Sequence, residues 1–241
     1  MGFSDQEGLI LSECLVEERP YSSCATTTQG LPFEVSIVTT ASELEEAVAV
    51  RSSAYERHNA PGAAKLREAE ADDSRPDVVV LIARQKLDGR AIGTIRVQPN
   101  FAEPMKFERS APLPAHLKGR RGAELMRLGV ANGTPGRMVT AALAKASYLI
   151  CRKSGVEHIY VAGRRPVDAI YRSYQFDDLL DGRKVELSYA PGALHSILCL
   201  PVRDAEERWR TRNFGLYSFM VLTHHADIAL DDQEIHRRLG S

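Results

Sequence analysis

Two short segments of the chain place ionisable residues within apolar, strand-like sequence. The segment 93–97 carries Arg96, and the segment 124–130 carries Glu124 and Arg127. The second segment continues through a loop rich in Gly, Asn and Thr into a long helical pattern. A strand that carries charged groups and leads to a helix N-terminus is a common architecture for binding an anionic ligand. The two segments therefore predict a binding site for an anionic substrate.

Hydrophobic periodicity predicts the elements that must position these residues. Residues 33–38 alternate as a strand, and Ser42 with Glu45 predicts a capping box that opens the next helix. Residues 78–83 and 91–97 predict an antiparallel hairpin, because an Asp-Gly turn separates two apolar runs. The hairpin would hold Arg96 beside a buried strand.

The second half of the chain predicts alternating strands and helices. The strand 123–130 leads to Thr134-Pro135, an N-cap and first-turn pair, and Gly155 ends the helix that follows. Further strands are predicted at 156–162, 185–189 and 195–202, and further helices from Pro166 to Tyr174 and at 204–212. This order indicates an α+β fold: a mixed, mostly antiparallel sheet flanked by helices, with one βαβ crossover at 123–162.

The composition is that of a globular protein, with 44% hydrophobic and 26% charged residues in 241. A net charge of −1 argues against a nucleic-acid partner, and no apolar stretch has the length of a transmembrane segment. We expect one domain at 31–223, an N-terminal extension at 1–30 and a polar C-terminal tail at 224–241. The cysteines form no CxxC pair and no secretory signal is visible, which predicts a cytoplasmic protein. The histidines lack zinc-site spacing, so no metal is predicted.

The order of elements and four sets of residues resemble the GCN5-related N-acetyltransferase (GNAT) fold. The similarity is closest to its acyl-carrier-protein-dependent branch, the long-chain N-acyl amino acid synthases and the acyl-homoserine lactone (autoinducer) synthases. It covers roughly residues 33–202. The four sets are an Arg and an aromatic residue on the first helix (Arg51, Tyr55), acidic residues in the following loop (Asp72, Asp73), a Gly-x-x-Arg strand (Gly93 to Arg96) and a Glu-x-x-Arg-x-x-Val strand (Glu124, Arg127, Val130).

Two departures from the family pattern narrow the expected function. The autoinducer synthases usually carry a tryptophan in the loop after the first helix, whereas the only tryptophan here is Trp209. Its absence there favours the N-acyl amino acid branch. The glycines of the turn 130–137 also do not have the spacing of the acetyl-CoA-binding branch. A turn of this kind is compatible with phosphopantetheine on a carrier protein.

The resemblance implies an N-acyltransferase that moves a long acyl chain from acyl carrier protein to the amine of an amino acid. No bound cofactor is expected, because the donor is carried on phosphopantetheine; acyl-CoA is the alternative donor. Three other functions stay open: an acyl-homoserine lactone synthase that also uses S-adenosylmethionine, a CoA-dependent N-acetyltransferase for a small amine, and a non-catalytic domain that binds acyl chains. A lipid product would allow peripheral membrane contact.

Acyl transfer to an amine requires a group that takes the amine proton. Glu124 is the candidate general base, directly or through water, provided that partial burial raises its pKa. Glu124 and Arg127 are three residues apart and would face opposite sides of an ideal strand. A β-bulge, which the resemblance implies, would bring both to one face. The alternative role of Glu124 is a salt bridge with Arg96 or Arg127.

The remaining candidates surround this acid. Arg96 and Arg127 suit a substrate carboxylate, although Arg96 is equally suited to a scaffold pair with Glu124 or Asp73. Arg51 and Tyr55 lie one helical turn apart, and with Asp73 they are candidates for the acceptor pocket. A helix face with one solvated arginine and one packed tyrosine explains the same pair.

Donor-side candidates follow the second key strand. The backbone amides of Val130, Asn132, Gly133 and Gly136 are candidates to hold pantetheine at the helix N-terminus, although the intervening proline has no N–H to add. Arg137 is a candidate contact for the phosphate or for an acidic carrier protein. A plain helix-entry loop explains the same residues.

The family resemblance also adds a catalytic candidate and two features of shape. Tyr171 lies where acetyltransferases have a tyrosine near the leaving sulfur, so it is a candidate to protonate the thiolate; packing against the sheet is its other role. We further expect an apolar tunnel beside the strand 123–130, and a splay between that strand and 156–162 near Val130.

Overall fold

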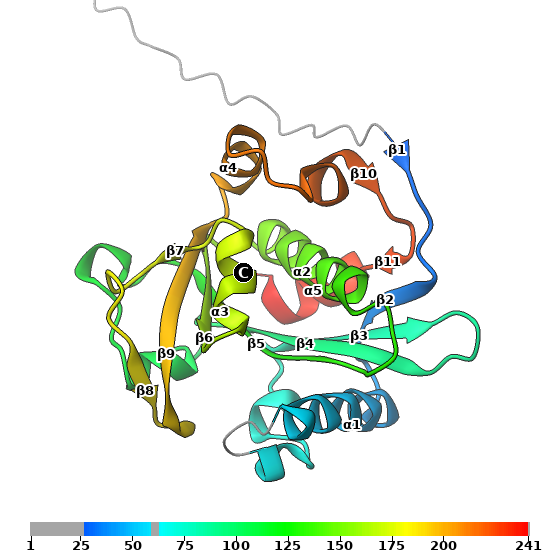
Figure 1. The fold of residues 1–241 in the computed structure, drawn as a ribbon, viewed down its shortest axis with the longest axis horizontal. Coiled ribbons are helices and arrows are strands. Elements are labelled where there is room, and N and C mark those ends of the chain that lie inside the picture. The colour runs from blue at the N-terminus through cyan, green and yellow to red at the C-terminus, as the bar shows by residue number, and fades with distance from the viewer. Residues whose placement is uncertain (1–26, 59–62, 241) are drawn as a thin grey trace, which may run out of the picture.

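A twisted sheet runs through the centre of the protein in the computed structural model, which describes residues 27–58 and 63–240 (Figure 1). Its nine strands have the order β11-β2-β3-β4-β5-β6-β9-β7, and β8 pairs with β9. The strands are β2 (Phe33–Ile37), β3 (Val79–Gln85), β4 (Ala91–Pro99), β5 (Gly122–Val130), β6 (His158–Gly163), β7 (Asp177–Asp178), β8 (Val185–Leu187), β9 (Ala190–Pro201) and β11 (Ile228–Ala229). A separate parallel pair joins β1 (Thr27–Thr28) to β10 (Thr223–His224).

The pairing of these strands confirms the predicted α+β topology. Strands β2, β3, β4 and β5 are antiparallel neighbours, and β6 pairs antiparallel with β9. Strands β5 and β6 are parallel, and helix α2 (Gly136–Lys153) makes the crossover between them. The predicted hairpin is β3–β4, and the predicted βαβ unit is β5-α2-β6.

Two glycines allow helices to cross the sheet closely on its opposite faces. Helix α1 (Ala41–Arg57) passes over Gly129, where an added Cβ would lie 2.9 Å from the Cα atom of Arg51. Helix α2 crosses Gly93, where an added Cβ would lie 2.4 Å from Val139. Figure 1 shows α1 on one side of the sheet, with α2 and α5 on the other. The two key strands thus have small residues where helices approach.

The two faces of the sheet bury different sets of side chains. Most of the large hydrophobic core lies under α2, with α3 (Val167–Ser173), α4 (Ala205–Thr211) and α5 (Asp232–Leu239). A smaller cluster packs the connection 99–119 against β6 and β9 through residues that include Phe107, Tyr160 and Ile197. None of the described helices has the length and apolarity needed to cross a membrane.

Helix boundaries differ from the sequence predictions at two N-termini. The capping box of α1 is formed by Thr40 and Glu43, two residues before the predicted Ser42–Glu45 pair. Both pairs have the same spacing, but Ser42 already lies inside the helix. Helix α2 begins at Gly136, and the hydroxyl of Thr134 donates to the Ala131 carbonyl oxygen at 2.8 Å rather than capping the helix. The predicted C-terminal stop at Gly155 is confirmed by its φ of 67° directly after the cap.

Where a polar tail was expected at 224–241, residues 224–240 include a strand and a helix of the packed fold. Strand β11 pairs in parallel with β2 at the edge of the sheet, and the carboxylate of Asp231 caps helix α5. Ile235 and Leu239 are buried in the main core, because α5 is amphipathic. Of the expected extension at 1–30, residues 1–26 lie outside the described residues. The division of the chain into one domain stays a prediction.

Candidate active site

A β-bulge in β5 places the key side chains on one face of the sheet. Met126 pairs with Arg96, but Gly129 pairs with Thr94, so Arg127 and Leu128 together oppose one residue of β4. Arg127 absorbs the extra residue with a φ of 60°, a left-handed conformation that costs roughly 1–2 kcal/mol for a residue with a side chain. The predicted bulge is confirmed, and it lets Arg127 share the α1 side of the sheet with Glu124.

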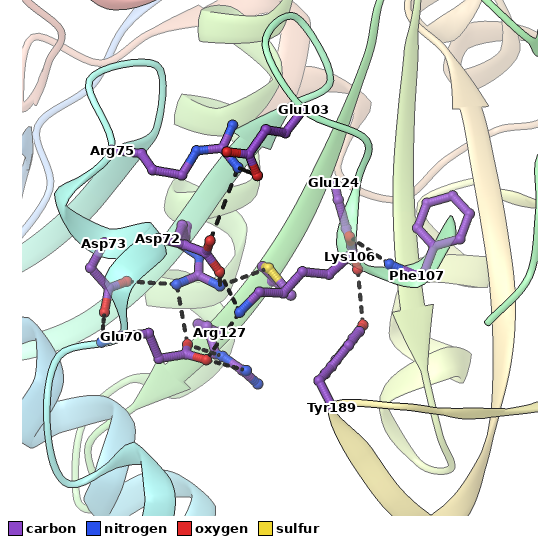
Figure 2. Close-up of polar contacts among 12 residues, drawn as sticks. Glu70, Asp72, Asp73, Arg75, Glu103, Lys106, Phe107, Glu124, Arg127 and Tyr189 are labelled. Carbon is purple, nitrogen blue, oxygen red and sulfur yellow. Dashed lines mark hydrogen bonds and ion pairs between the residues drawn. The ribbon is translucent and has the colours of Figure 1, made fainter. Parts of the chain in front are cut away.

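Glu124 is completely buried in this face, and among the described residues its hydrogen bonds come from two uncharged groups. Its Oε2 accepts a hydrogen bond from the backbone N–H of Phe107 at 3.3 Å, and its Oε1 accepts one from the hydroxyl of Tyr189 at 3.0 Å (Figure 2). Burial raises the pKa of Glu124, and these two hydrogen bonds with the charges of Arg96 and Arg127 oppose the rise without cancelling it. The raised pKa is what a carboxylate needs to accept a proton efficiently.

A dense set of ion pairs lies beside Glu124 on the same face (Figure 2). The 3-10 helix Ala71–Ser74 and the residue before it bring three carboxylates, Glu70, Asp72 and Asp73, to the arginines. We call these three acids and their four cations the ion-pair cluster; the cations are Arg51, Arg96, Lys106 and Arg127. Lys106 comes from the connection 99–119, and its Nζ contacts Glu70 at 3.2 Å and also Asp72.

Arg96 takes the scaffold role that the sequence left open, and Arg51, which is buried rather than solvated, shares it. Asp73 accepts from Arg51 at 3.1 and 3.0 Å and from Arg96 at 2.8 Å. Arg96 also contacts Glu70 at 3.1 Å and the sulfur of Met126 at 3.0 Å. Burial opposes the charge of Asp73, but the hydrogen bond from Arg51 and the charges of both arginines outweigh it and lower its pKa. The charges of Asp73, Arg51 and Arg96 therefore compensate one another inside the protein.

Arg127 joins the ion-pair cluster to the surroundings of Glu124. Its Nε and Nη2 donate to the two carboxylate oxygens of Glu70 at 2.6 and 2.8 Å. Burial opposes the charge of Glu70, but this bidentate bond, with the charges of Arg96 and Lys106, lowers its pKa strongly. The guanidinium of Arg127 also lies 5.6 Å from the ring centre of Tyr189. Arg127 therefore has a carboxylate on one side and the phenol that binds Glu124 on the other.

An apolar pocket lies on the opposite face of β5. Its interior leaves about 20 Å³ of space, enough for about one water molecule, so its walls would have to move apart to admit an acyl chain. Its lining includes Leu125, Leu128, Ala144, Tyr148, Ile170, Tyr171 and Trp209. Leu125 and Leu128 alternate with Glu124 and Arg127, so one strand contributes to both the pocket and the acid. The pocket has the place expected for an acyl tunnel.

The strands beside this pocket diverge as expected. Parallel pairing between β5 and β6 is present from Gly122 to Leu125 and ends there, although β5 continues to Val130. Strand β6 continues to pair with β9 as far as Gly163. The edge of β5 that faces β6 therefore offers backbone groups without a strand partner between residues 126 and 130, next to the pocket.

The two candidate tyrosines lie at the pocket and above Arg127. Tyr171 is buried in the pocket wall and packs edge-on against Phe176, with ring centres 5.6 Å apart. Burial raises its pKa, and the nearby Tyr55 adds to the rise, so it is protonated at neutral pH. Tyr55 is half-buried, and it also interacts with Arg127 and Tyr189. Tyr55 thus acts electrostatically both on Arg127 and Tyr189 of the site and on Tyr171 of the pocket.

The loop 130–137 uses some of its polar groups internally. The N–H of Gly136 donates to the Thr134 carbonyl oxygen at 2.7 Å, and the Val130 carbonyl oxygen accepts from Arg57 at 2.9 Å. Asn132, Gly133 and Arg137 are exposed, and their N–H groups and the guanidinium have no hydrogen-bond partner within 27–58 and 63–240. Of the five predicted donor-side residues, these three keep groups free for a ligand.

Sequence reasoning missed Glu70, Lys106 and Tyr189. Glu70 stands among other acids in a polar stretch, and its partner Arg127 is 57 residues away. Tyr189 falls in a predicted strand, and its hydrogen bond to Glu124 spans 65 residues. Their local sequence carries no signal of these contacts, because each partner is brought in by the sheet.

Comparisons with known proteins identify the fold. No protein-family model matches the chain, and no curated protein matches it. Among solved structures, FeeM, an N-acyl amino acid synthase from uncultured soil microbes, is 14% identical with a TM-score of 0.60, over 73% of this chain and 93% of FeeM. BjaI, a CoA-dependent acyl-homoserine lactone synthase solved with SAM and isopentyl-CoA, is 16% identical with a TM-score of 0.58, over 86% of this chain and 99% of BjaI. MesI, another CoA-dependent acyl-homoserine lactone synthase, is 21% identical with a TM-score of 0.52, over 75% of this chain and 95% of MesI.

At these identities the likeness concerns the fold. The chain has the GNAT-like fold of the acyl synthases, as its sequence predicted.

Proposed function

We propose that the protein is an N-acyltransferase that moves a long acyl chain from the phosphopantetheine of acyl carrier protein to the amine of an amino acid. The observation that carries the proposal is the arrangement around β5. An apolar pocket lies on one face, a buried carboxyl of raised pKa lies on the other, and the edge between them is open towards β6. The likeness to an N-acyl amino acid synthase supports it.

In this proposal the acyl chain and the acceptor amine bind on opposite faces of β5. An acyl chain would enter the pocket beside Leu125 and Leu128, because burial of each CH₂ contributes about 0.8 kcal/mol. The thioester carbonyl would then lie at the divergence of the strands, where unpaired backbone groups are available to bind it. The acceptor amine would approach from the side of Glu124 and attack the carbonyl carbon.

The acceptor carboxylate would bind Arg127 with Lys106. Arg127 keeps its Nη1 without a hydrogen-bond partner among the described residues, and Lys106 reaches the same cluster from the connection 99–119. Arg96 and Arg51 are committed to Asp73 and would hold this pair in place. In this proposal Tyr171, protonated and buried in the pocket wall, is placed to return a proton to the leaving thiolate.

In this proposal the acyl donor binds at the start of α2. Arg137 is exposed at the start of α2, where it is available to an acidic carrier surface or to a phosphate. The likeness to two CoA-dependent lactone synthases makes acyl-CoA the alternative donor and a lactone the alternative product. Trp209, the only tryptophan, lines the pocket and donates to the Tyr174 carbonyl oxygen at 2.8 Å, so it does not serve an acceptor site near α1.

A product assay tests the proposal. The protein is incubated with a long-chain acyl carrier protein or the matching acyl-CoA, together with a pool of amino acids and S-adenosylmethionine, and the products are identified by mass spectrometry. We expect N-acyl amino acids from the carrier protein. A lactone as the product, or product from acetyl-CoA alone, would overturn the proposal. Acyl binding without any turnover would identify a binding domain.

A further inference from the structure

Tyr189 joins the buried acid to the surface of the protein. It lies at the corner between β8 and β9, and its hydroxyl donates to Oε1 of Glu124 at 3.0 Å. Figure 2 shows the ring rising from this corner towards Glu124. Tyr189 is half-buried, whereas Glu124 has no exposed surface. Of the two hydrogen-bonded side chains, Tyr189 is therefore the one with surface exposed to solvent.

Glu124 needs such a neighbour to exchange protons. Its other hydrogen bond comes from the backbone N–H of Phe107, and a peptide N–H at neutral pH does not pass protons on. Within the described ranges, the hydroxyl of Tyr189 is the side-chain hydrogen bond that Glu124 makes. A hydroxyl both donates and accepts, so it can take one proton while it releases another.

We infer that Tyr189 relays the proton of the acceptor amine to Glu124, so that the phenol, rather than the carboxylate, meets the amine. This inference rests on the proposed function and names a further catalytic residue for it. The oxygen of Tyr189 accepts the amine proton while its own proton passes to Oε1 of Glu124. The C–N bond forms, the C–S bond breaks, and the leaving thiolate takes a proton from solvent or from Tyr171.

The charges around Tyr189 favour this role. Arg127 of β5 lies 5.6 Å from the ring centre and would stabilise negative charge that develops on the phenol during transfer. Glu124, Arg127 and Tyr55 of α1 act electrostatically on Tyr189, and Arg96, Arg127 and Tyr189 act on Glu124. Burial and the carboxylate raise the pKa of Tyr189, so the phenol is protonated before transfer begins.

Tyr189→Phe tests the relay, because phenylalanine keeps the ring over Arg127 and removes only the hydroxyl. We expect kcat to fall by roughly 10²-fold, in the range of a lost acid–base group, with the KM of the acyl donor unchanged. The hydroxyl also lowers the pKa of Glu124, so its loss should move the acid limb of the pH profile to higher pH. Tyr217→Phe, at a half-buried tyrosine outside the site, is the matched control.

Two results separate the relay from the proposed function. If the wild-type protein is active and Tyr189→Phe leaves kcat and the pH profile unchanged, the relay is wrong and the function stands. If the protein transfers an acyl group from none of the donors, the proposed function is wrong. The titration of Glu124 then still tests whether Tyr189 donates a hydrogen bond to it. That titration is followed by infrared difference spectra that Glu124→Gln assigns. An unchanged titration in Tyr189→Phe would overturn the hydrogen bond on which the relay depends.

Discussion

Glu124 and the pair Glu70 and Asp73 are acids on the same face of the sheet, but their surroundings give them opposite properties. Glu70 and Asp73 accept hydrogen bonds from arginines, which lower the pKa of both despite burial. Glu124 receives bonds from a backbone N–H and a phenol, and burial raises its pKa. A carboxylate held by guanidinium groups stays ionised and builds a scaffold. A buried carboxylate whose hydrogen bonds come from uncharged groups is suited to take a proton.

The largest effect should come from removing the unpaired acid. Glu124→Gln keeps the shape and the hydrogen-bond acceptor but cannot take a proton, so kcat/KM should fall by about 10²–10⁴-fold. Thermal stability should be unchanged or higher, because an ionised group no longer has to be buried. Steady-state kinetics and a melting curve measure both effects. Glu34→Gln, an exposed position on β2, is the control, and equal activity in the two variants would remove Glu124 from the chemistry.

The opposite pattern is expected for the scaffold acids. Asp73→Ala leaves Arg51 and Arg96 without their shared carboxylate, so the free energy of unfolding should fall by about 3–5 kcal/mol. Urea unfolding measures the loss. Glu207→Ala is the control: it breaks an exposed ion pair with Arg210 and should leave the urea midpoint of unfolding nearly unchanged.

A double variant sharpens this test of the scaffold. Arg51→Met added to Asp73→Ala removes one of the two arginine charges that the single change leaves without a carboxylate. The double variant should therefore lose less free energy of unfolding than the sum of the two single changes. Additive losses would show that the ion-pair cluster does not act as a unit.

A change in the apolar pocket should alter which acyl-chain lengths the protein accepts. Ala144→Phe adds a ring to the pocket wall, so the longest acyl donors should lose about fourfold in kcat/KM for each excluded CH₂, at about 0.8 kcal/mol per CH₂. Short donors should react as before. A series of acyl donors measures this, with Ala169→Phe on the exposed side of α3 as the control. A uniform loss across all chain lengths would contradict the assignment of this pocket to the acyl chain.

The smallest expected effect concerns the helix that carries Arg51. Thr40→Ala removes the cap of α1 and should destabilise the protein by about 1 kcal/mol, whereas Ser42→Ala should change little. Thermal melting of the two variants compares them directly. A larger loss in Ser42→Ala would restore the capping box that the sequence suggested.

The regular elements were predictable because each leaves a local pattern, whereas the bulge was implied by the family resemblance. Alternating apolar residues mark β4 and β5, and the spacing of Glu124 and Arg127 requires an irregularity if both serve one site. The capping box was misplaced by two residues because Thr40–Glu43 and Ser42–Glu45 share one spacing. The C-terminal helix was missed because its buried residues, Ile235 and Leu239, stand alone in a polar stretch.

The partners within the site were harder to predict. Arg96 was open to a substrate or to Asp73, and the sequence holds nothing that decides between them. The choice depends on where the 3-10 helix Ala71–Ser74 lies against the sheet, and that position follows from packing. Tyr189 and Lys106 likewise reach the site from connections whose paths are set by the second hydrophobic cluster.

The pH dependence of single-turnover acyl transfer tests most directly the claim that Glu124 is the base. Because burial raises the pKa of Glu124 above its ordinary value of 4.5, the wild-type rate should fall as the pH drops through that raised pKa and the carboxyl becomes protonated. Glu70 and Asp73, with lowered pKa values, stay ionised through the same range. The account predicts an acid limb above pH 4.5 that disappears in Glu124→Gln. The same limb in both proteins would contradict it.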